Sequence, residues 1–497
     1  MVMRRSALYT HKFFFGLIII WMSSASVTFA ADSLATRLDR LVSHSKWSKM
    51  RIGVRVETLG ENPVLVYDHQ GTELFKPASN QKIVTAAAAM CLLPRDFKFQ
   101  TTLARHGSDL VLIGSGDPSF GDPRIAERVG QPITGVFHAW ADKLKARGVT
   151  TIPGDLLYDD FIFDQTFLHP GWSDQKNLAA WYTAPVGGLN FANNCVGVVI
   201  KPGPKPGAAV EVTLIPTTPW IQLQNKAVTA SKGQPLVHRI GKGPVTITVN
   251  GKVSRASSAA APLWITITDP GTFFATTART ALAARGIRIV GQTQRHRFRQ
   301  PGKPLPHDLD IVAVHETRIA DFLWRMNKRS VNMYAEALLK TLGAHRQRGR
   351  LPEQGTVEKG QVAVGQFLEA LGMSKDSYVI DDGSGLSHHN RLAPRVLTAV
   401  LRYMDRHPDR QVWWDSLARP GEQGATLTRR MKDLGDKVFA KTGHINGVSA
   451  LSGYVLGPDQ RRYAFSVICE GSGGHPVQDG VCRILATWDG TSSGRAR

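Results

Sequence analysis

Residues 78–89 read ASNQKIVTAAAA and place Ser79 three positions before Lys82, at the start of an alanine-rich run. Alanine is the strongest helix former, so this stretch predicts a helix. One helical turn would bring the lysine to the face that carries the serine, close to free backbone N–H groups that stabilise negative charge. An N-cap serine followed by a solvated lysine fits the same residues, and Ser43 and Lys46 repeat the spacing elsewhere. The rest of the chain must therefore decide between a nucleophile and a helix cap.

Two further motifs favour the nucleophile. Each occurs once in the chain: Ser330-Val331-Asn332 and Lys441-Thr442-Gly443. A serine nucleophile needs a base, and a lysine can act as one only when burial or a second cation lowers its pKa from about 10.4. Lys441 would be that cation, Ser330 could pass a proton to a leaving group, and Asn332 could orient Lys82 and a substrate amide. A strand at the K-T-G sequence could also pair with an extended peptide while its lysine attracts a carboxylate.

In this order the three motifs resemble the penicillin-binding protein and serine β-lactamase superfamily. The stretch between Lys82 and Ser330 is far longer than in β-lactamases. Such an insertion is typical of the class C low-molecular-mass penicillin-binding proteins, the D-alanyl-D-alanine carboxypeptidase/endopeptidase family. Five local sequences support this narrower resemblance: GSGDPSF (114–120), WYTAPVGGLNFANNCV (181–196), SVNMYAEALLKTLG (330–343), DDGSGLS (381–387) and KTGHINGVSALSGYV (441–455).

The resemblance implies a serine D-alanyl-D-alanine carboxypeptidase and leaves D,D-endopeptidase activity open. Such an enzyme cleaves peptidoglycan stem peptides through an acyl-serine intermediate and is acylated by β-lactams. Ser79 would attack, Lys82 would take its proton, and the backbone N–H groups of Ser79 and His444 would form the oxyanion hole. The residues implied to contact substrate are Lys441, Thr442, Gly443, Asn446, His388, Asp159 and Phe163. No cofactor is indicated, and the adjacent His388 and His389 lack the spacing of metal ligands.

Three positions depart from the family pattern. Val331 stands where aspartate is usual, His444 follows the K-T-G sequence where serine or threonine is common, and His388 replaces a frequent arginine. These departures keep open an alternative function, a cell-wall-binding scaffold of the same fold with weak turnover. A β-lactamase is a further alternative, although no deacylating glutamate is evident.

The resemblance implies a multidomain α/β fold. A transpeptidase/β-lactamase-like antiparallel sheet flanked by helices would be interrupted by an inserted α/β domain that carries a nested β-rich module. Changes in composition along the chain give the expected bounds: a catalytic domain over residues 31–96 and 305–497, an inserted domain over 97–200 and 266–304, and the module over 201–265. Residues 201–255 hold eight Lys/Arg and a single acidic residue, Glu211.

The N-terminus predicts export. Arg4, Arg5 and Lys12 precede an apolar run from Phe13 to Met22, which is short against the ~20 residues needed to cross a bilayer. We therefore expect a cleaved signal peptide over residues 1–30 and a periplasmic protein, with an uncleaved anchor as the alternative. A net charge of +21 then favours loose association with anionic cell wall or lipid. Nucleic acid is disfavoured because no nucleic-acid motif is present.

Four cysteines permit disulfides in an exported chain, or buried thiols. Cys469 and Cys482 follow one another in a predicted strand and helix and could be packed neighbours. The sequence leaves the pairing and the oligomeric state open.

Overall fold

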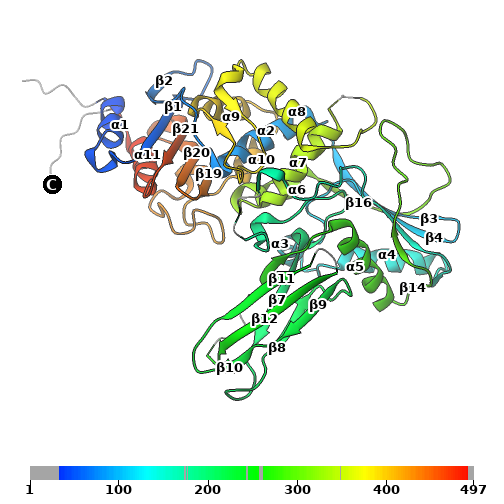
Figure 1. The fold of residues 1–497 in the computed structure, drawn as a ribbon. Coiled ribbons are helices and arrows are strands. Elements are labelled where there is room, and N and C mark those ends of the chain that lie inside the picture. The colour runs from blue at the N-terminus through cyan, green and yellow to red at the C-terminus, as the bar shows by residue number, and fades with distance from the viewer. Residues whose placement is uncertain are drawn as a thin grey trace, which may run out of the picture.

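The computed structural model describes residues 33–172, 175, 177–241, 244–256, 261–346 and 349–490 (Figure 1). The predicted signal peptide, residues 1–30, lies outside the described residues. Within the described part of the chain, no helix combines the length and the apolar character needed to cross a membrane.

The ends of the described chain meet in an antiparallel five-stranded sheet of order β19-β20-β21-β1-β2. Its strands are β1 (Arg51–Thr58), β2 (Leu65–His69), β19 (Val438–Ile445), β20 (Val448–Leu456) and β21 (Arg462–Glu470). The helices α1 (Leu34–Val42) and α11 (His475–Thr487) share one apolar cluster with this sheet. Helices α2 (Gln81–Leu92) and α9 (Pro394–Asp405) share another, so the sheet is buried between two helical layers (Figure 1).

Helix α2, the helix that the alanine-rich run predicts, lies at the centre of the helical part. Its residues Ala86 to Ala89 are fully buried. Because alanine side chains are small, neighbouring helices can approach the backbone of α2 closely. The neighbours are α6 (Ile319–Lys328), α7 (Asn332–Ala344), α8 (Val357–Ala370) and α9; the short α10 (Arg410–Ser416) packs on α6.

A second five-stranded sheet, of order β15-β6-β4-β3-β16, forms the core of an inserted α/β unit. Its strands are β3 (Lys98–His106), β4 (Asp109–Ile113), β6 (Leu156–Asp159), β15 (Thr293–Arg295) and β16 (Asp310–Arg318). The unit also contains α3 (Pro123–Arg128), α4 (Gly135–Ala146), α5 (Pro270–Ala284) and the short pair β5 (Thr151–Ile152) and β14 (Arg288–Ile289). Helices α4 and α5 pack together and against the sheet.

This sheet extends beyond the bounds expected for the insertion. Strand β16 pairs with β3 in antiparallel register from Asp310 to Arg318, beyond residue 304, where the sequence predicts the end of the insertion. Exposed and buried residues do not alternate regularly along β16, and its partner strand β3 lies far upstream in the sequence. A local pattern cannot reveal such a pairing, and the domain bounds themselves stay a prediction.

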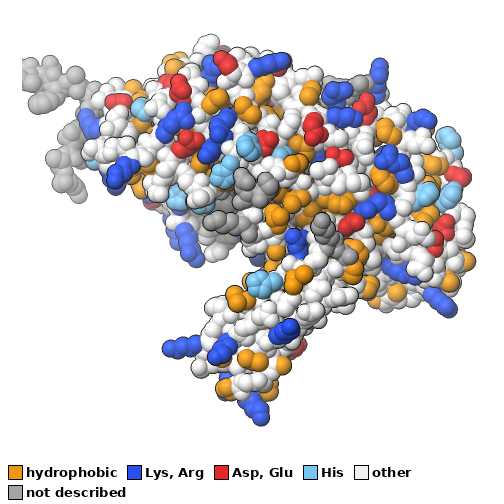
Figure 2. Space-filling model, viewed as in Figure 1, with side chains coloured by type: hydrophobic (Ala, Val, Ile, Leu, Met, Phe, Trp, Pro, Cys, Tyr) orange, Lys and Arg blue, Asp and Glu red, His pale blue; other side chains and the backbone are white. Residues whose placement is uncertain are grey.

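A module of short strands projects from the body (Figure 1). It consists of a three-stranded sheet, β13-β7-β8, and a four-stranded sheet that contains β9 to β12. The strands are β7 (Cys195–Lys201), β8 (Glu211–Ile215), β9 (Ile221–Asn225), β10 (Val228–Ala230), β11 (Pro235–Ile240), β12 (Val245–Ser254) and β13 (Leu263–Thr266). Lys and Arg side chains are scattered over this lobe, with few acidic ones among them (Figure 2).

All four cysteines are free thiols. Cys469 and Cys482 lie in one apolar cluster, as expected of packed neighbours, but they form no disulfide.

Candidate active site

Ser79 lies in a single 3₁₀ turn, Ala78–Asn80, that leads directly into α2. Ala78 has a positive φ of 47°, which turns the chain into the helix. The turn is held from outside by Gly385, where a Cβ would lie 1.8 Å from the carbonyl oxygen of Ala78. Only glycine therefore fits at position 385, and this close approach fixes the backbone next to Ser79. The side chain of Ser79 stays partly exposed.

Lys82 is fully buried beneath Ser79. Its Nζ lies 2.9 Å from Ser79 Oγ, 2.6 Å from Asn332 Oδ1 and 2.8 Å from the carbonyl oxygen of Ser384. Three acceptors match the three protons of an ammonium group. Burial nevertheless lowers the pKa of Lys82 to about 7. The negative charges of Asp382 and Glu336 raise this pKa, but their effect is smaller than that of burial. A lysine with this pKa can take a proton from a serine hydroxyl near neutral pH.

A second buried lysine approaches the same place from β19. Lys441 Nζ donates to Ser330 Oγ at 2.8 Å and to the carbonyl oxygen of Thr442 at 2.6 Å. Burial, and then the charge of Lys82, hold the pKa of Lys441 well below its usual value. Ser330 has a positive φ of 59°, a strained conformation for serine that is typical of functional sites. The site therefore contains two hydrogen-bonded serine–lysine pairs, Ser79 with Lys82 and Ser330 with Lys441.

Asn332 begins α7 and links the site to the inserted unit. Its Oδ1 accepts from Lys82, and its Nδ2 donates to the carbonyl oxygen of Tyr182 at 2.8 Å. Tyr182 lies in the turn Trp181–Thr183, which precedes β7. The Asn332 side chain therefore contacts both Lys82 and the turn Trp181–Thr183 of the inserted unit.

The K-T-G strand β19 is the edge strand of its sheet. A Cβ on Gly443 would lie 3.0 Å from the carbonyl oxygen of Pro77 and 3.1 Å from the amide nitrogen of Ser79, so a side chain there would crowd the serine. The side chain of His444 is exposed, as is that of Asn446 in the turn after the strand. His388 lies in the loop 381–390 and is partly exposed.

Asp159 and Phe163 lie in the interior, which differs from their expected contact with the stem peptide. The Asp159 carboxylate is fully buried and accepts from three backbone N–H groups, those of Phe161, Phe298 and Arg299. Phe163 is fully buried, with its ring where a Cβ on Gly116 would stand. These side chains organise the end of β6 and the chain after it. We therefore leave both out of the proposed substrate site.

Residues that the motifs did not reveal form the floor beneath Lys82. The carboxylate of Asp382 accepts from five groups: Gly385 N at 2.6 Å, Ser387 N at 2.7 Å, Asn390 Nδ2 and Trp172 Nε1 at 2.8 Å each, and Ser384 Oγ at 3.4 Å. These bonds shape the DDGSGLS loop so that the Ser384 carbonyl points at Lys82. The Asp382 side chain thereby anchors the loop that contacts Lys82.

Glu336 lies one turn after Asn332 on α7 and accepts from Gly383 N at 3.1 Å. Burial, and then the charge of Asp382, raise the pKa of Glu336 to about 7. Helical spacing could have placed this residue on the face that carries Asn332, but its burial is not visible in the sequence. Among the described residues, no group of three or more His, Cys, Asp or Glu side chains could hold a metal ion.

A serine–lysine pair at a helix start, an S-x-N segment and a K-T-G edge strand define a serine acyltransferase of the penicillin-binding class. The chain belongs to the D-Ala-D-Ala carboxypeptidase 3 (S13) family, whose model matches residues 34–489. This membership confirms the predicted family and the prediction of a serine-type carboxypeptidase.

The relatives agree with this assignment. The chain is 32% identical over 452 residues to the D-alanyl-D-alanine carboxypeptidase of Actinomadura sp. (strain R39), covering 86% of this chain and 79% of the relative. The crystal structure of penicillin binding protein 4 (dacB) from Haemophilus influenzae matches with a TM-score of 0.72 at 23% identity, over 91% of this chain and 99% of that chain. Its complex with a novel β-lactam matches with a TM-score of 0.68 at 22% identity, over the same shares. These structures confirm the predicted fold class.

Proposed function

We propose that this protein is an exported D-alanyl-D-alanine carboxypeptidase in which Ser79 is the nucleophile and Lys82 the general base. The observation that carries the proposal is the 2.9 Å contact between Lys82 Nζ and Ser79 Oγ, made by a lysine whose pKa is about 7. Ser79 Oγ attacks the carbonyl carbon of the D-Ala-D-Ala bond while its proton passes to Lys82. The backbone N–H groups of Ser79 and His444 receive the oxyanion.

The departing amine then needs a proton. It takes up the proton that Lys82 received from Ser79, relayed by Ser330, whose Oγ is held by the 2.8 Å contact with Lys441 Nζ. Lys82 is thereby neutral again for the second step. Lys441, Thr442 and Gly443 face the terminal carboxylate of the substrate. Water then hydrolyses the acyl-serine, with Lys82 again as the base. A β-lactam acylates the same serine, and its acyl-enzyme is released slowly.

The departures from the family pattern are compatible with turnover. Val331 is buried and belongs to an apolar cluster, so the position that is usually aspartate is not needed for the contacts of Ser330 and Asn332. His444 contributes its backbone to the site while its side chain is exposed. His388 and Asn446 are partly or fully exposed and remain candidates for contacts to the stem peptide. D,D-endopeptidase activity on cross-linked stem peptides is included in the proposal because it uses the same acyl-serine.

The test compares wild type with Ser79→Ala. Wild-type protein should bind a fluorescent penicillin covalently and release D-alanine from muropeptides, and the variant should do neither. Labelling without sustained D-alanine release would favour the scaffold alternative. Rapid turnover of nitrocefin would favour a β-lactamase.

A further inference from the structure

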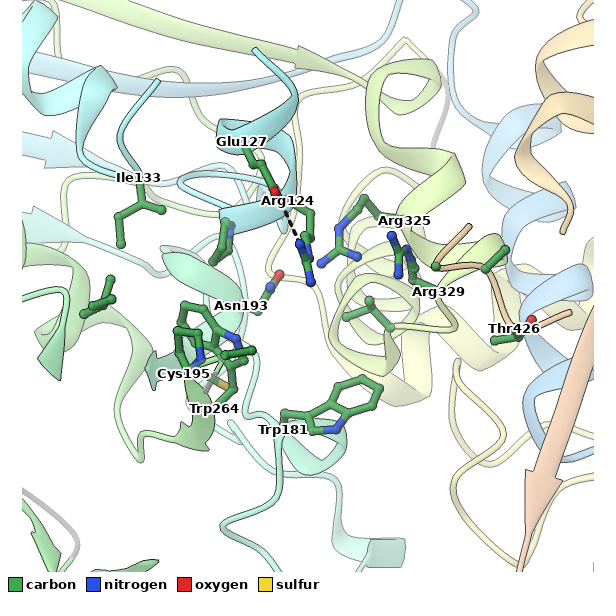
Figure 3. A pocket seen from close by; sticks show the side chains of 17 residues that line it. Arg124, Glu127, Ile133, Trp181, Asn193, Cys195, Trp264, Arg325, Arg329 and Thr426 are labelled. Atoms are coloured by element: carbon green, nitrogen blue, oxygen red, sulfur yellow. Dashed lines mark hydrogen bonds and ion pairs between the residues drawn. The ribbon is translucent and has the colours of Figure 1, made fainter. Parts of the chain in front are cut away.

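A cleft of about 620 Å³ opens beside the S-x-N segment, between the inserted unit and the helical part (Figure 3). Two of its lining residues border the candidate active site. Val331 stands between Ser330 and Asn332, and Trp181 precedes Tyr182, whose carbonyl accepts from Asn332. The cleft therefore borders the chemical centre, although none of the proposed steps uses it. Pockets of this size bury most of the surface of a drug-sized ligand.

Three arginines lie along one side of the cleft, with Trp181 and Trp264 lining the other side in the view of Figure 3. Arg325 is buried and pairs with Asp122 at 2.8 Å. Arg124 pairs with Glu127 at 2.7 Å. Arg329 makes no hydrogen bond or ion pair within the described part of the chain, and its guanidinium lies against Gly424. The nearby carboxylates that act on Arg329, Glu422 and Glu127, are paired with Lys328 and Arg124. Arg329 is therefore the cation of the cleft that has no direct ion-pair partner among the described residues.

This charge lies in an unfavourable environment. Burial, and then the neighbouring cations Arg325 and Arg124, lower the pKa of Arg329. A guanidinium does not lose its proton in a protein, so an anion bound beside Arg329 would offset the cost that the two neighbouring cations impose. Asn193 lines the same cleft, and its Oδ1 is buried without a hydrogen-bond partner within the described residues. The cleft therefore offers a cation for an anionic group and, in Asn193 Oδ1, an acceptor for a donor such as a peptide N–H.

We propose that this cleft binds a carboxylate of the stem peptide that is remote from the scissile bond, with Arg329 as its principal partner. The proposal rests on the proposed function, because it concerns the substrate of the same site. A planar guanidinium pairs with a carboxylate through two parallel hydrogen bonds. The tryptophans on the opposite wall suit the methyl and methylene groups that flank a carboxylate in a short peptide. Substrates with a free carboxylate at this position are thereby preferred.

The experiment uses two synthetic pentapeptides that end in D-Ala-D-Ala. They are identical except that the side-chain-linked glutamate carries either a free α-carboxylate or an α-carboxamide. We expect wild-type kcat/KM to be about tenfold higher for the free carboxylate, the effect of one added charge-assisted pair. Each rate is divided by the number of sites counted by stoichiometric penicillin labelling, so that misfolded protein does not contribute.

Three variants make the result specific. Arg329→Gln should bring the ratio of the two kcat/KM values close to one, and Arg329→Lys should keep part of it. Glu127→Gln removes an acidic side chain that lines the cleft and should increase the ratio. Arg288→Gln is the matched control, because Arg288 is an exposed arginine on β14 away from the cleft.

Two results would overturn the assignment of the cleft while the function of Ser79 stands. These are a wild-type ratio near one, or a ratio that Arg329→Gln leaves unchanged. An equal loss in Arg288→Gln would also overturn it, since the preference would then come from overall charge. Failure of both peptides to release D-alanine, together with absent penicillin labelling, would instead contradict the proposed function.

Discussion

Asn332 Oδ1 accepts a 2.6 Å hydrogen bond from Lys82 Nζ, and this contact joins two motifs that are separated by the whole inserted unit. The same side chain donates to the carbonyl oxygen of Tyr182. The orientation of the candidate base therefore depends on the docking of the insertion. An enzyme with this arrangement should lose acylation rate when the link is cut, even if Ser79 and Lys82 are intact.

Asn332→Ala tests the link. We expect the second-order rate of acylation by penicillin to fall about 100-fold, the usual effect of misplacing a catalytic group by about 1 Å. Stopped-flow or gel-based labelling measures this rate. Asn62→Ala, in an exposed loop, is the control and should match wild type. A rate for Asn332→Ala within threefold of wild type would contradict the positioning role.

The pH dependence of acylation should report the pKa of Lys82. Lysine acts as a base only when it is neutral, and the neutral form exists above its pKa. Because the pKa of Lys82 is about 7, the acylation rate should rise with pH and reach half its maximum near pH 7. A midpoint near the usual pKa of lysine, about 10.4, would exclude the buried neutral base.

Glu336→Gln should move this midpoint to lower pH. The charge of Glu336 raises the pKa of Lys82 against the effect of burial, so its removal leaves the lysine easier to deprotonate. The conservative amide keeps the acceptor for Gly383 N. Glu61→Gln, at an exposed position, serves as the control. An unchanged pH profile would show that Glu336 is structural only.

Gly385→Ala should disturb the turn that carries Ser79. Its new Cβ would lie 1.8 Å from the Ala78 carbonyl oxygen, at a residue with a φ of +80°. We expect a loss of about 2–4 kcal/mol in the free energy of unfolding and little penicillin labelling. Gly372→Ala is the matched control, with a φ of +79° and no atom within 4 Å. It should cost only about 1 kcal/mol and keep its labelling. Equal thermal shifts in the two variants would contradict the crowding argument.

The projecting module should contribute to binding of the cell wall through charge. Its exposed lysines include Lys205, Lys226, Lys232 and Lys252. Changing these four to glutamine should weaken sedimentation with purified sacculi at low salt and remove most of its salt dependence. The control changes four exposed lysines of the body, Lys49, Lys143, Lys375 and Lys432. Equal binding of sacculi by both variants and wild type would show that the positive charge of the module does not contribute to cell-wall binding.

The three motifs could be found in the sequence because each holds reactive groups at a fixed spacing on one local element. Ser79 and Lys82 lie within one turn, and the K-T-G residues lie on one strand. The floor of the site could not be found this way. Asp382 acts through hydrogen bonds to its own loop and to Trp172 of the inserted unit, and such contacts depend on tertiary structure.

Burial was the other missing information. Asp159 is an acidic residue at a strand end, but its buried carboxylate accepts hydrogen bonds from backbone N–H groups of a segment distant in the sequence. Strand β16 was missed for a similar reason, because it pairs with a strand far upstream. Arg329 looks in the sequence like one more surface cation. Its charge is unusual because Arg325 lies one turn earlier on α6 and the fold brings Arg124 of α3 beside both.

The most direct test of the central claim is the site of the penicillin adduct, found by mass spectrometry of a proteolytic digest. The account predicts one adduct, on the peptide that contains Ser79, and none in Ser79→Ala. Ser43→Ala is the natural control, since Ser43 and Lys46 have the same spacing but both are exposed on the surface. An adduct that persists in Ser79→Ala, or one found on another serine, would contradict the assignment of the nucleophile.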